Sequence, residues 1–171
     1  MTHATTLRTS WSSKSLPWLI PTVLVSAPRD STIVVLTPWI EDVVVSVPKC
    51  DGDRPLCGSV KLSLLLEWLG RAHNKKFVLY VRDDQLRPTL NYRLRPIAGS
   101  AHPYVSLRGI ALLHAKLLVT DSVVVETSAN LLTNSLYRNL ELVSVYSNPE
   151  NSAVRHVGRF FAAHSLTLPG R

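Results

Sequence analysis

Apolar positions along this chain occur in two kinds of run, which predict strands alternating with helices. Short runs rich in β-branched residues are typical of buried strands, and they occur at 32–36, 43–45, 77–81, about 104–107, 112–120, 122–127 and 139–146. Longer amphipathic runs predict helices at 16–27, from an N-cap at Ser59 to His73, near 131–137 and at about 150–164. This alternation predicts an α/β fold in which a mixed β-sheet is flanked by helices on both faces.

The stretches between these elements divide the chain into an arm and one domain. Residues 1–15 are polar and aperiodic, which predicts a flexible N-terminal arm. Residues 16–171 are enough to bury one hydrophobic core, so we expect a single domain there. Residues 83–103 contain several prolines and a group of arginines, and they predict a basic loop.

Composition and charge narrow the choice of partner. Apolar residues make up 46% of the chain and charged residues 18%, which argues against disorder. The net charge of +7 at pH 7 favours a polyanionic partner such as nucleic acid, an anionic membrane surface or a phosphorylated substrate. The apolar run Leu16–Val25 is too short to span a bilayer, and the N-terminus lacks the features of a secretory signal. We therefore expect a cytoplasmic protein without stable membrane insertion.

Two cysteines, Cys50 and Cys57, flank a loop rich in Gly, Pro and Asp. Their spacing does not match a C-x-x-C zinc or redox motif, and the sequence has no second pair. Two alternatives follow: two free thiols, or a local disulfide that closes this loop.

The densest group of polar residues within apolar sequence lies in the segment LLHAKLLVTDSVVVETSANLL. Polar groups in a core need partners or a purpose. His114 and Lys116 alternate on one predicted strand, so their side chains face the same side of it. A tight turn at 120–123 pairs residues whose numbers sum to about 243. The segment with Ser128 and Asn130 therefore returns to the histidine.

These residue types suit the cleavage of a phosphodiester. The imidazole of His114 can attack phosphorus and form a covalent intermediate, and Glu141 on a later strand can fix the orientation of that imidazole. No group of Asp, His or Cys has the spacing of metal ligands, so we expect no metal and no other cofactor. The predicted phosphate-binding residues are Lys116, Ser128, Asn130 and Asn139, the last sharing a strand face with Glu141.

Two further residues complete the candidate set. Asp121 lies in the predicted turn, where Asp side chains commonly bond to nearby backbone amides, so we expect a structural role for it. Arg108 lies near the start of the motif strands, and it is the predicted nucleic-acid contact among the arginines of this region.

The spacing of the candidate residues resembles the HKD signature of the phospholipase D superfamily. His114-x-Lys116 is followed after four residues by Asp121, and then by Ser-Ala-Asn and Asn-Leu-Glu elements. The match covers about residues 110–146. Thr127 stands where the family usually has Gly, and a β-branched residue resists positive φ, so we expect a different local loop there.

The resemblance implies a two-step reaction through a phosphohistidine, with a second histidine acting first as acid and then as base. Larger family members carry two motifs, whereas this chain has one. It therefore resembles the short bacterial endonucleases of the superfamily, which build their site across a homodimer. We predict a metal-independent nuclease that cleaves DNA or RNA, with DNA favoured. The alternatives are a phospholipase D or phosphatidyltransferase that acts on lipid, and a non-catalytic nucleic-acid-binding protein.

Overall fold

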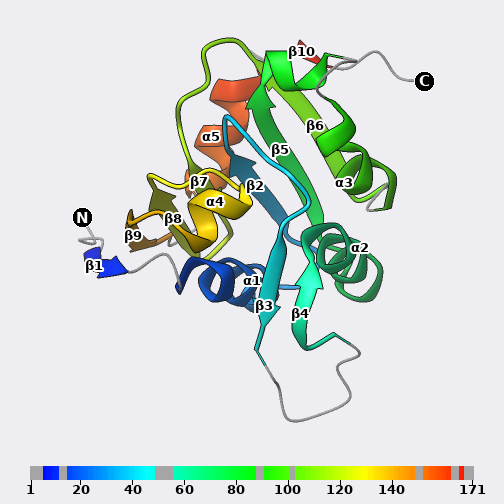
Figure 1. Ribbon diagram of the computed structural model, residues 1–171. Coiled ribbons are helices and arrows are strands. Elements are labelled where there is room, and N and C mark those ends of the chain that lie inside the picture. Colours follow the sequence, from blue (N-terminus) through cyan, green and yellow to red (C-terminus); the bar gives the residue numbers. More distant parts are fainter. Residues whose placement is uncertain are drawn as a thin grey trace.

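The computed structural model describes residues 6–11, 15–48, 56–87, 91–100, 103–148, 152–162 and 166–167. Most strands join in one eight-stranded sheet with the order β1-β9-β8-β7-β2-β5-β6-β10 (Figure 1). Its strands are β1 (Thr6–Trp11), β2 (Thr32–Leu36), β5 (Lys76–Arg82), β6 (Val105–Ile110), β7 (Leu117–Val119), β8 (Val123–Thr127), β9 (Glu141–Ser147) and β10 (Leu166–Thr167).

The sheet is mixed, as the sequence predicts. Strands β2, β5 and β6 run parallel in its centre, and the other neighbouring pairs are antiparallel. The valine run at 43–45 contributes to a separate two-stranded sheet of β3 (Val44–Val47) and β4 (Gly58–Lys61). Ser59 lies within β4, so the prediction that it caps the following helix is wrong. Lys61 occupies the cap position instead, because pairing with β3 keeps the backbone extended up to that residue.

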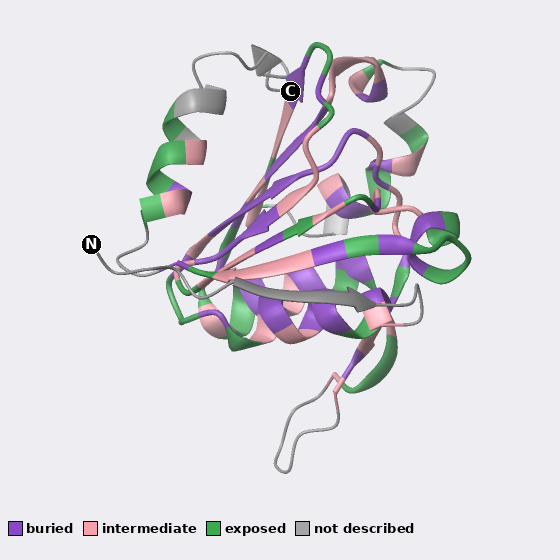
Figure 2. Cartoon of the chain, turned by 90° about the vertical axis from the view of Figure 1, so that its left-hand side faces the viewer, coloured by how far each residue is buried: buried purple, intermediate pink, exposed green. Residues whose placement is uncertain are grey.

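Helices cover both faces of the sheet, which confirms the predicted layers. The helices are α1 (Leu16–Ser26), α2 (Leu62–His73), α3 (Arg95–Ser100), α4 (Thr133–Tyr137) and α5 (Ser152–Ala162). Side chains alternate along β2, so Ile33 and Val35 join the core under α1 and α2, whereas Val34 and Leu36 join the core under α5. Figure 2 shows the buried strands between α5 on one side and the helices of the other layer.

The segment 83–103 was predicted as a loop, and this prediction is wrong for most of it. It contains short 3₁₀ turns at Asp83–Leu86 and Asn91–Arg93 and the helix α3. Leu94 and Ile97 are buried, and their spacing of three residues places them on one helical face. The prolines obscured this short apolar period in the sequence.

The strand predicted at 112–120 is shorter than expected. Only Leu117–Val119 forms β7, because its neighbour β2 ends at Leu36, the partner of Leu117, and offers no ladder beyond it. Leu112 has φ of 57°, a left-handed conformation that a strand does not accommodate. The segment 111–116 therefore connects β6 to β7 without strand pairing.

Three further expectations concern the N-terminal arm, the two cysteines and membrane insertion. Thr6–Trp11, within the predicted arm 1–15, forms β1 and pairs with β9 at the edge of the sheet. Cys57 is exposed and free, whereas Cys50 lies outside the described residues, as does most of the loop between them. None of the helices in the described ranges has the length and apolar character needed to cross a bilayer.

Candidate active site

The hairpin of β7 and β8 positions the central part of the candidate site, and its predicted register is confirmed. Leu117 pairs with Glu126 and Val119 with Val124, so the residue numbers of each pair sum to 243. The Thr127 amide donates to the Lys116 carbonyl at 3.1 Å, which extends the same register by one pair. The two segments that carry the motif residues therefore leave the hairpin side by side at its open end.

Ser128, Asn139 and Glu141 form a hydrogen-bonded cluster at that end, which we call the carboxylate cluster. The Ser128 hydroxyl donates to Oε2 of Glu141, and Nδ2 of Asn139 donates to Oε1 at 3.4 Å. The backbone amide of Leu142 donates to the Ser128 hydroxyl at 3.0 Å. Glu141 is buried, so these donors replace the water that its carboxylate loses.

Asn139 reaches this cluster in a different way from the one predicted. It precedes β9, which begins at Glu141, so the two residues do not share a strand face. The backbone amide of Asn139, just beyond α4, instead donates at 3.1 Å to the carbonyl of Asn134 in the first turn of that helix. The helix end and the strand start therefore place Asn139 beside Glu141.

His114 and Lys116 form the second part of the site, on the unpaired segment before β7. The prediction that both lie on one strand is wrong, for the reason given above. Lys116 folds back instead, and its Nζ donates to the His114 carbonyl at 3.0 Å. The His114 side chain is exposed, and among the described residues it has no hydrogen-bond partner. Glu141 is bonded to Ser128 and Asn139 rather than to this imidazole.

The loop after β8 follows Thr127, where a loop that differs from the family's stays a prediction. Thr127 does not adopt positive φ, and its Oγ1 accepts a hydrogen bond from the Ala129 amide at 3.0 Å. This local turn is of the kind that Thr hydroxyls stabilise, and it leads directly into Asn130. Oδ1 of Asn130 is buried and has no partner in the described part of the chain. The Asn130 side chain, next to the hairpin end, therefore has a carboxamide oxygen that is free to accept a hydrogen bond.

Asp121 lies in the turn between β7 and β8, where the sequence placed it. The Thr120 hydroxyl accepts from the Val123 amide at 3.0 Å, and the Asn148 side chain donates to the Thr120 carbonyl at 2.6 Å. Oδ1 of Asp121 is buried without a partner among the described residues. Thr120 and Asn148 thus make the contacts expected of Asp121, and sequence reasoning missed both. The turn-forming chemistry of Thr and Asn was the available signal.

Arg108 lies in β6, apart from the other candidates. It pairs in register with Tyr80 of β5, and β6 is three strands from β7, about 14 Å across the sheet. Burial raises the pKa of Tyr80, while the charge of Arg108 and its hydrogen bond act in the opposite direction. The structure does not bring Arg108 into the carboxylate cluster, and its contact with nucleic acid stays a prediction.

A small cavity lies beneath the hairpin end. It has a volume of about 40 Å³, and its lining includes Lys116, Thr127 and Ala129 together with side chains of α1 and α2. Ligand pockets are commonly about 300–1,000 Å³, so this cavity is too small for a substrate. The described residues also contain no group of three His, Cys, Asp or Glu side chains arranged to hold a metal ion. The exposed surface around His114 is therefore the accessible part of the site.

No protein-family model matches this sequence, and no curated protein matches it. Solved structures do match. Nuc from Salmonella typhimurium, a phospholipase D family member, is 13% identical with a TM-score of 0.67, over 98% of this chain and 100% of Nuc. NucT from Helicobacter pylori is 12% identical with a TM-score of 0.57, over 97% of this chain and 99% of NucT.

A third similar structure is the phosphatidylserine synthase of Haemophilus influenzae, at 14% identity and a TM-score of 0.60, over 96% of this chain and 40% of that protein. Identities this low establish the fold and leave function to be argued from the site. The similarity extends over nearly the whole chain, including the strands that flank the candidate residues. The protein therefore has the phospholipase D fold that its motif predicted.

Proposed function

We propose that this protein is a metal-independent phosphodiesterase that cleaves nucleic acid, with DNA favoured over RNA, at a site shared by two copies of the chain. One observation supports the proposal: on a phospholipase D fold, the open end of one hairpin places the backbone of Lys116 beside Thr127, next to the hydrogen-bonded Ser128, Asn139 and Glu141. The motif residues on these segments are His114, Lys116, Ser128, Asn130, Asn139 and Glu141.

The proposed reaction has two steps. In the first, a ring nitrogen of His114 attacks phosphorus, the phosphorus–oxygen bond to the leaving group breaks, and His114 of the partner subunit gives that oxygen a proton. In the second, water attacks the phosphohistidine and passes its proton to the partner's His114. The products are an alcohol, a phosphomonoester and the free imidazole. Lys116 and Asn130 stabilise the charge on the non-bridging oxygens, and Glu141 holds Ser128 and Asn139 through hydrogen bonds.

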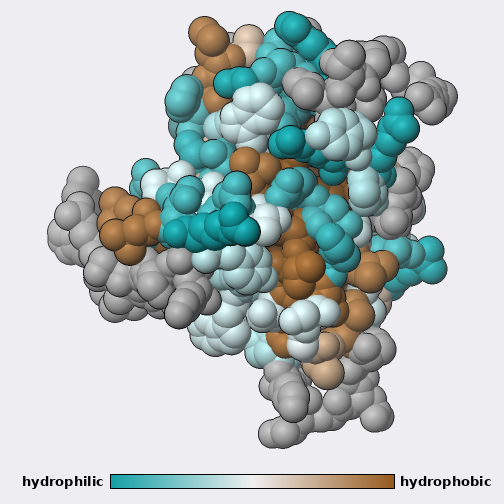
Figure 3. All heavy atoms as spheres, viewed as in Figure 1, coloured by the Kyte–Doolittle hydropathy of each residue, from teal (hydrophilic) through white to brown (hydrophobic). Residues whose placement is uncertain are grey.

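Exposed leucines support a shared site. Leu112 and Leu140 are 89% and 87% exposed, and each lies within two residues of a motif side chain, His114 and Glu141 respectively. Leu142 follows at 65% exposure. Figure 3 shows hydrophobic residues at the edge of the molecule, in the region of β8 and β9. Covering such residues with a second copy buries apolar surface and brings the second histidine that a single motif lacks.

Charge favours nucleic acid over lipid as the substrate. The fold alone does not decide, because one similar structure is a phosphatidylserine synthase. A net charge of +7 attracts a polyanion, whereas phosphatidylcholine has no net charge to attract it. A non-catalytic nucleic-acid-binding protein is the other alternative; the intact His114, Lys116, Asn130 and Glu141 argue against it, whereas the replacement of Gly by Thr127 leaves it open.

The test uses the full chain in EDTA with four substrates: single-stranded DNA, plasmid DNA, RNA and phosphatidylcholine vesicles. We expect cleavage of nucleic acid, and a reaction on DNA quenched in alkaline denaturant should carry a nucleotide linked through phosphorus to His114 by mass spectrometry. The His114→Ala variant serves as the control and should cleave none of them. Cleavage of lipid alone would reject the nuclease, and salt-sensitive DNA binding without turnover would favour the non-catalytic alternative.

A further inference from the structure

An open hollow of about 360 Å³ lies beside the candidate site, outside the motif residues. Its lining consists of Trp39, Gln85, Arg93 and Leu132. Leu132 is two residues beyond Asn130, and the strand-like bridge between Ile40 and Leu131 fastens the Trp39 segment to this stretch. The hollow is therefore joined to the site through the backbone that carries Asn130.

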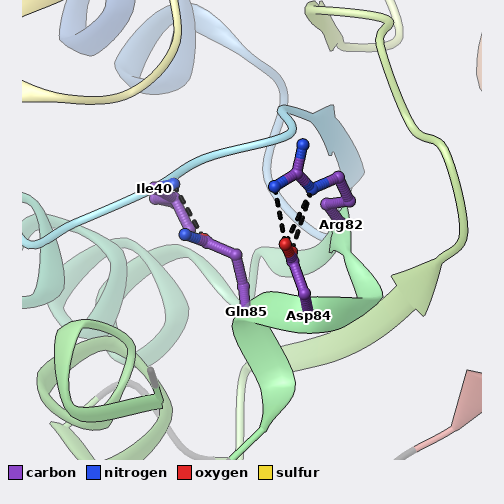
Figure 4. Close-up of polar contacts among 4 residues, drawn as sticks. All are labelled: Ile40, Arg82, Asp84 and Gln85. Atoms are coloured by element: carbon purple, nitrogen blue, oxygen red, sulfur yellow. Dashed lines mark hydrogen bonds and ion pairs between the residues drawn. The ribbon is translucent and has the colours of Figure 1, made fainter. Parts of the chain in front are cut away.

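Trp39 is held in place by a cation on its ring. The guanidinium carbon of Arg82 lies 4.1 Å from the centroid of the Trp39 ring system. Arg82 is itself fixed by Asp84, with Nε at 3.0 Å from both carboxylate oxygens and Nη2 at 2.6 Å from Oδ2 (Figure 4). A planar, fixed cation over one face of an indole stabilises its orientation. The tryptophan is thus a rigid part of the wall of the hollow.

Gln85 supplies a polar group of fixed orientation. The side chain is buried, and its Oε1 accepts from the Ile40 amide at 3.1 Å (Figure 4). That bond determines which end of the carboxamide is the donor end, because Nε2 carries the two N–H groups. No described residue accepts a hydrogen bond from Nε2. A ligand with a carbonyl or ring-nitrogen acceptor would complete its hydrogen bonding.

Arg93 gives the hollow a positive charge. Its Nε donates to the Tyr92 hydroxyl at 3.0 Å, and the negative charge of Glu41 faces it. Burial raises the pKa of Glu41, whereas hydrogen bonds from Thr133 and the charges of Arg93 and Lys61 lower it. The lowering effects are larger together, so the pKa of Glu41 lies below its usual value. Glu41 therefore stays ionised and helps to keep Arg93 at the rim.

We infer that this hollow binds a nucleobase of the substrate strand, next to the phosphate that His114 attacks; the inference rests on the proposed nuclease function. An aromatic wall, an amide donor and a guanidinium suit the face, the polar edge and the adjoining phosphate of a nucleotide. The volume also falls within the range of small-ligand pockets. The guanidinium of Arg93, which lines the hollow, repels the quaternary ammonium of a choline headgroup. The occupant is therefore a base rather than such a lipid.

Occupation by a base has a consequence for substrate choice. A base in a duplex is stacked on both faces and paired at its edge, so it enters such a hollow only after unstacking. A single strand offers unstacked bases at little cost. The hollow therefore favours single-stranded substrate over duplex.

The test measures binding in a His114→Ala background, so that cleavage does not interfere. The probes are a fluorescein-labelled single-stranded DNA 12-mer and an abasic deoxyribose-phosphate 12-mer. We expect Trp39→Ala and Trp39→Leu to weaken binding of the normal strand by about 5- to 100-fold, the effect of losing one stacked base. Binding of the abasic strand should not change. Trp39→Phe should retain most of the affinity, because it keeps an aromatic ring.

Trp18→Ala is the matched control, since Trp18 is a tryptophan 45% exposed on α1 and outside the hollow. The inference is overturned if Trp39→Leu binds the normal strand like the parent, or weakens both strands equally. A selective loss of binding to phosphatidylcholine vesicles would assign the hollow to lipid instead. Failure of the nuclease proposal shows separately, as absence of cleavage by the native chain, because this assay does not depend on turnover.

Discussion

The two parts of the candidate site are organised to different degrees. In the carboxylate cluster, Ser128 and Asn139 donate to a buried Glu141, and the sheet fixes the backbone on both sides. His114 and Lys116 lie on a segment that no strand pairs, and the only partner of the Lys116 ammonium among the described residues is a backbone carbonyl. The acidic part is therefore set by folding, whereas the basic part is open: it lies on an unpaired segment whose His114 side chain is exposed to solvent.

This difference has a physical basis in the sheet. Both edges of β8 are paired, with β7 and with β9, so its end has little freedom. The segment before β7 lacks a neighbour because β2 stops at Leu36. A cation at such a position keeps its hydration until an anion arrives, which avoids the cost of burying an unpaired charge.

The largest expected effect tests the open part. His114→Ala should lower turnover of nucleic acid by at least about 10⁴-fold, because the nucleophile is lost. The melting temperature should stay within the error of measurement, since the side chain is exposed and has no partner among the described residues. Steady-state kinetics and thermal denaturation check the two expectations. A folded variant with activity near that of the native chain would remove His114 from the mechanism.

Glu141→Gln tests the organised part, where activity and stability should fall together. Loss of the charge that holds Ser128 and Asn139, two of the predicted phosphate-binding residues, should lower kcat by about 10²- to 10³-fold. The variant should also be less stable by about 1–3 kcal/mol, because charge-assisted hydrogen bonds from Ser128 and Asn139 are weakened. Urea denaturation measures the second effect. Glu126→Gln, an exposed carboxylate on β8, is the control and should change neither quantity.

The third prediction concerns the exposed leucines beside the candidate site. Leu140→Asp should shift the protein from dimer to monomer in sedimentation equilibrium, because a charge would have to be buried in the interface. Activity at a fixed low protein concentration should fall at least about tenfold, which corresponds to about 1.4 kcal/mol of association free energy. Leu64→Asp, on the exposed side of α2, controls for a new surface charge. Full activity as a monomer would contradict the shared site.

The sequence predicted the layers of the fold and the hairpin register, because both depend on local periodicity. Alternation fixed which residues of β2 face each core, and the turn at 120–123 fixed the pairing of Leu117 with Glu126. The candidate site residues were identified from their spacing along the chain, and their roles stay predictions. These features depend on residues that are close together in the sequence, so they can be predicted without knowing which elements pack side by side.

Features that depend on a neighbour could not be predicted. The strand before β7 is short because β2 ends early, and Ser59 is extended because β3 pairs with it. Asn148 holds the turn at Thr120 from 28 residues away. The Trp39 hollow joins segments from four places in the chain, and no periodicity marks it. Long-range contacts of this kind come from packing, which the local pattern does not contain.

The turn between β7 and β8 allows a comparison with a smaller expected effect. Asn148 makes a hydrogen bond to this turn, whereas Oδ1 of Asp121 has no partner among the described residues. Asn148→Ala should lower the free energy of unfolding by about 1–3 kcal/mol, since the Thr120 carbonyl loses a buried donor. Asp121→Ala should change it by less than about 0.5 kcal/mol, because Oδ1 of Asp121 has no partner among the described residues. Urea denaturation of both variants measures the difference. A larger loss for Asp121→Ala would restore it as the residue that holds the turn.

The smallest expected effect is on the pair that fixes Trp39, an organised contact at the surface. The hydrogen bond and charge of Arg82 hold the pKa of Asp84 below its usual value, so the pair stabilises the fold only while Asp84 is ionised. A carboxyl with a lowered pKa contributes stability above its unfolded value, about 3.9, and loses it as the pH falls through the folded value. Asp84→Asn should therefore melt slightly below the native chain at pH 7, and the difference should disappear at pH 2. A difference that is the same at both pH values would show that the carboxylate charge does not hold Arg82 over Trp39.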